Sequence, residues 1–253
     1  MLRIDVDAAA SERVAISAAA DPALALDQLT AAAGERAWQR SAWADEVARA
    51  RVTVPAEWRA LGRENRQPIH PLRVCTALQP LLDRGAILVA DGGEFGQWAQ
   101  AGLEAGTRMI NGLSGSIGSA IPLALAAKVA QPERTVLAVL GDGTFGFHAM
   151  ELDTAVRYGL PIITIVGNDA RWNAEHQLQR QHYGDTRTVA CELLPTRYDQ
   201  VASALGGHGE QVERAEDLAP ALERAIASGK PACLNVLIDG IAAPTYGTKP
   251  GGH

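Results

Sequence analysis

Two acidic side chains follow apolar runs in this sequence, at positions where they could bind one metal ion together. The run Thr135–Leu140 leads into Gly-Asp-Gly with Asp142 at its centre, and Ile162–Val166 leads into Gly-Asn-Asp, which ends in Asn168 and Asp169. Open α/β sheets carry their ligand sites at the carboxyl ends of strands. Asp142 could share a hard cation with Asp169 or with Asn168, because Mg²⁺ prefers oxygen ligands and often bridges carboxylates to a phosphate.

Glycines beside these acids indicate a phosphate group as the second ligand. Gly141 and Gly143 flank the first acid, and Gly167 precedes the second pair. Glycine lets the backbone approach a ligand closely, and amides at the start of a following helix can hold phosphate. Gly-Asp-Gly alone is a weak signal, since Asp-Gly is also a common turn dipeptide. The second acidic strand end, one β-α-β unit later, favours a metal–diphosphate site.

The elements that must position these motifs alternate along the chain after Pro68. The predicted strands are 86–90, 135–140, 162–166 and 232–238, and the predicted helices are 70–82, 118–129, 148–158, 197–205 and 215–228. Apolar strands that alternate with amphipathic helices indicate a parallel sheet covered on both faces. We therefore expect an α/β fold with a doubly wound, mostly parallel six-stranded sheet and helices on both faces.

The first 67 residues differ from the rest. They contain a possible strand at 2–6, helical patterns from Asp21 through Leu29 and over 37–51, and an aperiodic stretch at 52–67 that reads as a linker. One strand and two helices can hardly bury a core. The sequence thus predicts a remnant of another domain plus linker (1–67), a binding domain (68–240) and a flexible tail (241–253).

Composition narrows the class of protein. The 253 residues are 47 % apolar and 21 % charged with a net charge of −6, which fits a globular protein and argues against nucleic acid or anionic membrane as the main partner. No apolar run approaches the roughly 18 residues of a membrane span. The acidic start is unlike a signal peptide, so we expect a cytoplasmic protein. Three distant cysteines, Cys75, Cys191 and Cys233, exclude a four-cysteine cluster and suit reduced thiols.

The metal motif resembles that of thiamine-diphosphate enzymes of the acetolactate synthase, benzaldehyde lyase and 2-hydroxyacyl-CoA lyase group. These enzymes carry Gly-Asp-Gly, a stretch of fixed length and an Asn-Asn pair, and GDGTFGFHAMELDTAVRYGLPIITIVGND is similar throughout. Upstream, ILVADGGEFGQWAQ resembles the turn that reaches the diphosphate from the other side, and NGLSGSIGSAIPLALAAK resembles the segment that holds the aminopyrimidine. The resemblance covers about Pro68–Ile238, and LRIDVDAAASERVA looks like the last strand of the family's middle domain.

Carried over residue by residue, the resemblance implies a site for thiamine diphosphate and Mg²⁺. Asp142, Asp169 and the backbone carbonyl of Arg171 would bind the metal. The amides of Gly143 and Thr144 would meet the diphosphate. The full set of implied cofactor contacts is Gly92, Gly93, Glu94, Phe95, Gly115, Ser116, Ile117, Gly141, Asp142, Gly143, Thr144, Asp169 and Arg171.

Two of these positions would act on the reactive end of the cofactor. The carbonyl of Gly115 would accept a hydrogen bond from its 4′-amino group, and Ile117 would lie under the bent cofactor. One position departs from the family, because Asp169 stands where an amide is usual and adds a negative charge beside the diphosphate. Arg171 or another cation could offset this charge. Gly-Asn-Asp occurs in the 2-hydroxyacyl-CoA lyase-like and acetolactate synthase-like branch, which favours lyase or acyloin-type chemistry.

The resemblance also implies an incomplete active site. In the family a glutamate in a separate pyrimidine-binding domain activates the cofactor, and nothing before Pro68 is long enough to be that domain. Glu94 belongs to the diphosphate-side turn and is not its equivalent. The expected function is the small subunit of a split lyase or synthase in a hetero-oligomer, or else this chain is one part of a larger one.

Two other functions stay open, a subunit of a two-chain 2-oxo acid decarboxylase and a non-catalytic cofactor-binding assembly subunit. The cysteine count disfavours an iron–sulfur oxidoreductase. The substrate would be a small molecule, a 2-hydroxyacyl-CoA or a 2-oxo acid.

Several other residues have weaker signals. His148 is a candidate for the pocket because it follows the diphosphate loop, whereas His176 and His182 are spaced for different helical faces and favour a surface role. Tyr246 and Lys249 lie in the tail, which could fold over a substrate but is more typical of a disordered end. The arginines of 49–66 form a solvated face or contact a CoA phosphate. Trp98 and Trp172 belong to the core or to an interface.

Overall fold

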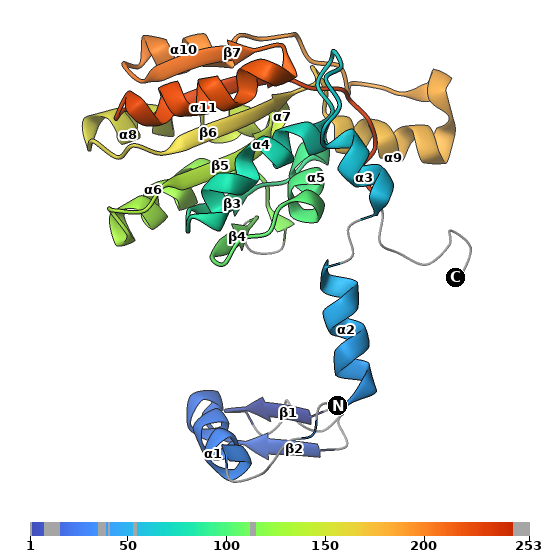
Figure 1. Cartoon of the computed structure of the whole chain (residues 1–253), viewed down its shortest axis with the longest axis vertical. Coiled ribbons are helices and arrows are strands. Elements are labelled where there is room, and N and C mark those ends of the chain that lie inside the picture. The colour runs from blue at the N-terminus through green and yellow to red at the C-terminus, as the bar shows by residue number, and fades with distance from the viewer. Residues whose placement is uncertain are drawn as a thin grey trace. The chain divides into compact units, whose positions relative to one another are not determined.

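The computed structural model describes residues 2–7, 16–34, 39, 41–52, 55–111 and 115–244, and its contacts divide the chain between Val54 and Pro55 (Figure 1). The first unit contains β1 (Leu2–Asp5), β2 (Ile16–Ala19), α1 (Pro22–Gly34) and α2 (Ala42–Val52). β1 and β2 pair in parallel, and β2 was not predicted. None of the described residues of this unit is buried, as expected for a segment too small to form a core.

The second unit is built around one six-stranded sheet, as predicted. Its strands are β3 (Ile87–Ala90), β4 (Arg108–Ile110), β5 (Val136–Gly141), β6 (Ile163–Asn168), β7 (His208–Val212) and β8 (Ala232–Leu237), in the order β4-β3-β5-β6-β8-β7. Every pairing in this sheet is parallel. The two edge strands, β4 and β7, were missed in the sequence because they lack the apolar runs of the strands between them.

Apolar side chains alternate between the two faces of the central strands and bury both. On one face Leu137 and Val139 of β5 join a cluster with α4, α5 and α11, and on the other Ala138 and Leu140 join a cluster with α6, α8 and α10. Parallel strands covered on both faces need such continuous apolar sequences. The doubly wound arrangement is therefore confirmed.

The helices of this unit are α3 (Ala56–Leu61), α4 (Pro71–Asp83), α5 (Glu94–Gly102), α6 (Ala120–Ala130), α7 (Asp142–His148), α8 (Glu151–Arg157), α9 (Asn173–Tyr183), α10 (Tyr198–Ala204) and α11 (Leu218–Ala227), with short 3₁₀ turns η3 (Asp185–Arg187) and η4 (Ala215–Asp217). The five predicted helices are present with shifted ends. α3, α5, α7 and α9 were not predicted. α3 lies in the predicted linker, α5 begins within the DGGEFG segment that was predicted as a turn, and α7 and α9 begin at or just after the Gly-Asp-Gly and Gly-Asn-Asp motifs.

The segment predicted as a linker packs against the second unit. Trp58 of α3 meets Trp98 edge-on at 5.9 Å between ring centroids. Gly62 lies so close to α4 that a Cβ there would stand 2.5 Å from Thr76 Oγ1. Contacts thus divide the chain before Pro55, whereas the sequence placed the boundary after residue 67.

Both ends of the predicted binding domain extend further than expected. Residues 241–244, assigned to the tail, are described, and Ala243 is buried. Tyr246 and Lys249 lie outside the described residues. The three cysteines are free and buried. Among the described residues, no helix has both the length and the apolar character to cross a membrane.

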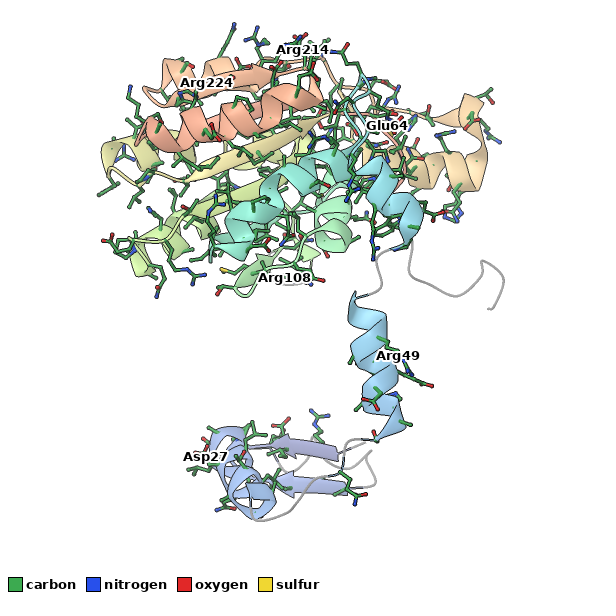
Figure 2. The ribbon with its side chains drawn as sticks, in the orientation of Figure 1. Asp27, Arg49, Glu64, Arg108, Arg214 and Arg224 are labelled. Carbon is green, nitrogen blue, oxygen red and sulfur yellow. The ribbon has the colours of Figure 1, made fainter. Side chains whose placement is uncertain are left out.

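Charged side chains, among them Arg214 and Arg224, extend from the surface of this unit (Figure 2), and several form ion pairs. Arg214 donates to Asp217 at 2.9 Å, and Arg224 donates to Glu210 at 3.1 Å. Exposed pairs of this kind contribute little to stability. The two apolar layers on the faces of the sheet therefore contribute most of the stability of this unit.

Candidate functional site

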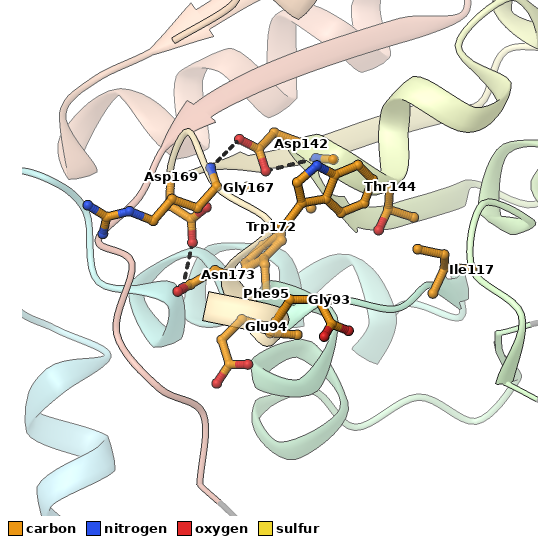
Figure 3. A pocket seen from close by; sticks show the side chains of 15 residues that line it. Gly93, Glu94, Phe95, Ile117, Asp142, Thr144, Gly167, Asp169, Trp172 and Asn173 are labelled. Atoms are coloured by element: carbon orange, nitrogen blue, oxygen red, sulfur yellow. Dashed lines mark hydrogen bonds between the residues drawn. The ribbon is translucent and has the colours of Figure 1, made fainter. Parts of the chain in front are cut away.

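A cleft with about 480 Å³ of empty space, part of it open to solvent, lies at the carboxyl ends of the central strands (Figure 3). It brings together most of the residues implied as cofactor contacts, namely Gly93, Glu94, Phe95, Ile117, Gly141, Asp142, Gly143, Thr144, Asp169 and Arg171. Gly92, Gly115 and Ser116 are not among its lining residues. Segments far apart in the sequence thus meet where the resemblance placed a single site.

Asp142 follows β5 and is almost completely buried, with 2 % of its surface exposed. Its carboxylate accepts hydrogen bonds from the backbone amides of Gly143 (2.8 Å) and Arg171 (3.2 Å). Burial raises the pKa of Asp142 from 3.8 to about 6, although these hydrogen bonds oppose the shift. The charged form of this side chain therefore costs more in the protein than in water, and a nearby cation would offset this cost.

Asp169 follows β6 and faces the same cleft. Its Oδ2 accepts a hydrogen bond from Asn173 Nδ2 at 2.7 Å. Burial, and then the negative charge of Asp142, raise the pKa of Asp169 to about 7. Strands β5 and β6 pair with Gly141 opposite Gly167, which explains why the acids that follow them come close together.

Asn168, the alternative to Asp169 as a ligand, is occupied elsewhere. Its amide donates to the carbonyl of Thr196 and to Asn235, each at 3.0 Å, and its oxygen accepts from the amide of Ala170 at 3.1 Å. Ala170 has a positive φ of 54°. This turn directs the next amide, that of Arg171, at Asp142, so Asn168 shapes the loop and leaves Asp169 facing the cleft.

The acidic pair fits a hard cation. Asp142 is buried and Asp169 is half-buried, and the charge of Asp142 raises the cost of ionising Asp169. A cation that binds between such carboxylates stabilises their charged forms. No group of three or more His, Cys, Asp or Glu among the described residues could hold a metal ion. Further ligands would then be carbonyl, phosphate or water oxygens, which is the donor set that Mg²⁺ favours.

Close contacts fix the glycine turns around the cleft. A Cβ on Gly92 would stand 2.2 Å from Ile117 Cγ2, so the turn after β3 lies directly against the segment that carries Ile117. A Cβ on Gly143 would stand 2.7 Å from the ring of Trp172. Trp172, assigned to core or interface from the sequence, therefore lines the cleft and lies over the Gly-Asp-Gly loop.

Asp91 is a structural acid at this edge that sequence reasoning missed. It is fully buried after β3, and its carboxylate accepts from the amides of Gly92 (2.7 Å), Gly118 (3.1 Å) and Ala120 (2.6 Å). These bonds tie the start of α6 to the turn that follows β3. The acid between a buried apolar run and two glycines is the signal that could have revealed it.

Glu94 begins α5 and joins the cleft to the chain after β8. It is buried, and its Oε1 accepts a hydrogen bond from the amide of Ala243. Burial raises the pKa of Glu94.

The candidate histidines do not line the cleft. His148 Nδ1 lies 2.7 Å from the carbonyl oxygen of Gly118, and His176 is buried in α9 with Nε2 4.0 Å from Glu192. His182 is exposed.

Comparison with known proteins identifies relatives of this chain. The family described as "Thiamine pyrophosphate enzyme, C-terminal TPP binding domain" matches residues 91–236. The acetolactate synthase large subunit IlvG of Mycobacterium tuberculosis is 42 % identical over 83 % of this chain and 39 % of its own length. The 2-hydroxyacyl-CoA lyase 2 of Caenorhabditis elegans is 39 % identical over 67 % of this chain and 28 % of its own.

A solved structure shares the fold. The thiamine diphosphate-dependent 4-hydroxybenzoylformate decarboxylase of Rhodococcus jostii RHA1 superposes with a TM-score of 0.70 at 19 % identity, over 94 % of this chain and 44 % of that one. The chain spans about 39 % of the length of the first curated relatives.

The acidic pair predicts how the stability of the metal-free protein depends on pH. Both folded pKa values, about 6 for Asp142 and about 7 for Asp169, lie above the ordinary 3.8. Stability from these groups is therefore present in full below about pH 4 and is lost progressively as the pH rises from about 4 through 6 and 7. Asp169→Asn should raise the Tm by a few degrees at pH 8 and by clearly less at pH 5. Thermal unfolding in EDTA at both values measures this, and a Tm difference independent of pH would contradict it.

Proposed function

The chain belongs to the thiamine pyrophosphate enzymes through their C-terminal TPP binding domain, and we propose that it is the diphosphate-binding half of a carbon–carbon lyase or acyloin-type synthase. The observation that carries the proposal is the acidic pair of buried Asp142 and half-buried Asp169, whose raised pKa values favour binding of a cation. Relatives named acetolactate synthase and 2-hydroxyacyl-CoA lyase support the two reaction classes.

In this proposal Asp142, Asp169 and the carbonyl of Arg171 bind Mg²⁺, which holds the diphosphate. The guanidinium of Arg171 is already shared, since its Nε donates to both carboxylate oxygens of Glu192 at 3.2 Å. Arg171 therefore offsets the charge of Asp169 only in part, and Mg²⁺ supplies the rest.

Other residues of the chain enclose and orient the cofactor. Bound thiamine diphosphate would supply the carbanion chemistry by which a carbon–carbon bond beside a carbonyl is broken or formed. Ile117, fixed against Gly92, would support it from below. Trp172 and Phe95 present apolar surface to the cleft and would exclude water from the diphosphate end.

We further propose that a partner chain carries the pyrimidine-binding domain with its activating glutamate, in a cytoplasmic hetero-oligomer. The match to the family lies in its C-terminal domain, which supports this arrangement. Glu94 cannot replace the glutamate from its position beside the diphosphate loop, where it accepts from Ala243. Phe147, which packs edge-on against Trp172, is 54 % exposed next to the cleft and would be covered by such a partner.

Loss of a metal ligand should abolish cofactor binding. Asp142→Ala removes one of the two carboxylates and should eliminate measurable binding of thiamine diphosphate with Mg²⁺. Asp169→Asn should have a milder effect, because an amide oxygen remains. Calorimetric titration of each purified variant measures this. If Asp142→Ala bound cofactor as tightly as the parent, the proposed site would be wrong.

Ile117→Ala should separate binding from turnover. The side chain would set the geometry of the rings without contacting the diphosphate, so cofactor affinity should change little. Turnover of the assembled enzyme should fall about 10- to 100-fold, within the range that positioning of reactants can supply. Steady-state kinetics beside the cofactor titration tests this, and unchanged turnover would remove the role assigned to Ile117.

Residues 1–253 expressed alone should be inactive, and a partner with the pyrimidine domain should restore activity. Proton transfer by a positioned acid typically contributes about 10²- to 10⁴-fold. The assay follows cleavage or condensation of a 2-hydroxyacyl-CoA and of a 2-oxo acid, with and without the partner, so the products also separate lyase from decarboxylase. Full activity of the lone chain, free of co-purifying protein, would refute the requirement for a partner.

A further inference from the structure

The chain after β8 forms a strap, residues Asp239–Ala243, that runs between α5 and α9 (Figure 1). Its two ends are held by side chains from distant parts of the sequence. Arg66 pairs with Asp239 at 2.5 Å, Trp98 Nε1 donates to the carbonyl of Ile241 at 3.2 Å, and Glu94 accepts from Ala243. The strap is therefore anchored to the domain at its beginning and at its end.

Between these anchors the strap lies against the loop that carries Asp169. A Cβ on Gly240 would stand 3.4 Å from Asn173 Nδ2, 3.4 Å from Arg171 Nη1 and 3.5 Å from Asp169 Cβ. These are ordinary van der Waals distances, so a Cβ at position 240 would touch all three residues. The middle of the strap is thus in contact with the proposed metal site.

Two amide side chains of α9 connect the strap to Asp169. Gln177 Nε2 donates to the carbonyl of Gly240 at 3.1 Å and to Asn173 Oδ1 at 3.0 Å. Asn173 Nδ2 donates in turn to Asp169 Oδ2 at 2.7 Å (Figure 3). The hydrogen-bond pattern fixes the orientation of both amides, because the reverse orientation of Asn173 would set its oxygen against a carboxylate.

We propose that Asn173 and Gln177 are positioning residues that hold Asp169 for metal binding and couple it to the strap. This inference rests on the proposed function of the site. A carboxylate has two oxygens, so Asp169 can accept from Asn173 with one and bind Mg²⁺ with the other. In Asp169→Asn one of the two oxygens becomes an NH2 group, so if the remaining oxygen binds Mg²⁺ the group that faces Asn173 Nδ2 is a donor and cannot accept from it.

The test measures Mg²⁺ binding in the presence of thiamine diphosphate by calorimetry. Asn173→Ala should raise the Kd for Mg²⁺ about 10- to 100-fold, the usual effect of losing a partner of a metal ligand. Gln177→Glu keeps the shape but loses both donated hydrogen bonds, and should raise the Kd about 2- to 10-fold. Unchanged affinity in both variants would overturn the proposal.

Gln181→Glu is the matched control for charge. Gln181 lies one turn further along α9, is exposed and makes no side-chain hydrogen bond to a described residue. The same substitution there should change the Kd less than about twofold. A loss as large as that of Gln177→Glu would show that added charge, and not the hydrogen bonds to Asn173 and Gly240, causes the effect, and would overturn the proposal.

A double-mutant cycle separates positioning from general stability. In the Asp169→Asn background, the effect of Asn173→Ala on the Kd should shrink to less than about twofold, because the amide group that replaces Oδ2 cannot accept the hydrogen bond from Asn173. An undiminished effect would overturn the proposal. If Asn173→Ala does not fold, Asn173→Asp, which keeps the shape but removes the donor, replaces it in the cycle.

Hydrogen exchange tests the coupling to the strap. Mg²⁺ with thiamine diphosphate should slow exchange at the amides of Ile241 and Ala243 in the parent but not in Gln177→Glu, since coupling between sites is reciprocal. Equal slowing in both would overturn the coupling.

If Asp142→Ala also binds cofactor normally, the proposed function fails, whereas a defect in Asp142→Ala with none in Asn173→Ala removes only the positioning role.

Discussion

Two carboxylates at the ends of adjacent strands, one buried and one half-buried, impose a constraint on the residues around them. Asp142 and Asp169 follow β5 and β6, which pair in register, so their closeness is a consequence of the sheet itself. Backbone amides of Gly143 and Arg171 and the side chain of Asn173 donate to them. These donors do not cancel the cost of burial, since both pKa values stay raised. The site is stable in its charged form when a cation joins it.

Asp91 is a buried carboxylate whose hydrogen-bond partners are backbone amides. It also follows a strand of the same sheet, yet its oxygens accept from the amides of Gly92, Gly118 and Ala120. Amide donors in this number compensate a buried charge well. The difference in partners separates a structural acid from a candidate ligand at the same sheet edge. It also explains why position after a strand is not sufficient to assign a metal ligand.

The sequence predicted the parts of the fold that depend on continuous apolar runs. β3, β5, β6 and β8 are buried on both faces and carry such runs, whereas the edge strands β4 and β7 are short or polar and were missed. The motif glycines masked the starts of α5 and α7 as turns. The resemblance brought Asp142, Asp169 and Ile117 to one site, and the structure places all three around one cleft. Their roles toward the cofactor remain predictions.

What the sequence could not predict depends on contacts between distant segments. In the sequence Trp172 has no feature that distinguishes it from an ordinary apolar residue. Its close contact with Gly143 shows that its ring lies over the Gly-Asp-Gly loop. Asn173 and Gln177 sit on a polar helix whose pattern indicates no function. Their proposed positioning role depends on the hydrogen bond that Gln177 donates to the carbonyl of Gly240, which is far along the chain.

Hydrogen bonds from Trp98 and Gln177 and to Glu94 connect the chain after β8 to the site. The apolar layers do not make this connection. Apolar packing holds β8 in the sheet but sets no preferred position for the chain that leaves it. Hydrogen bonds from Trp98 and Gln177 and to Glu94 fix that chain as the strap. Because Gln177 also orients Asn173, a shift of the strap changes the donor available to Asp169. In our proposal the order of the strap and the charge state of the acidic pair are therefore parts of one equilibrium, which a bound cation would move toward the ordered, ionised state.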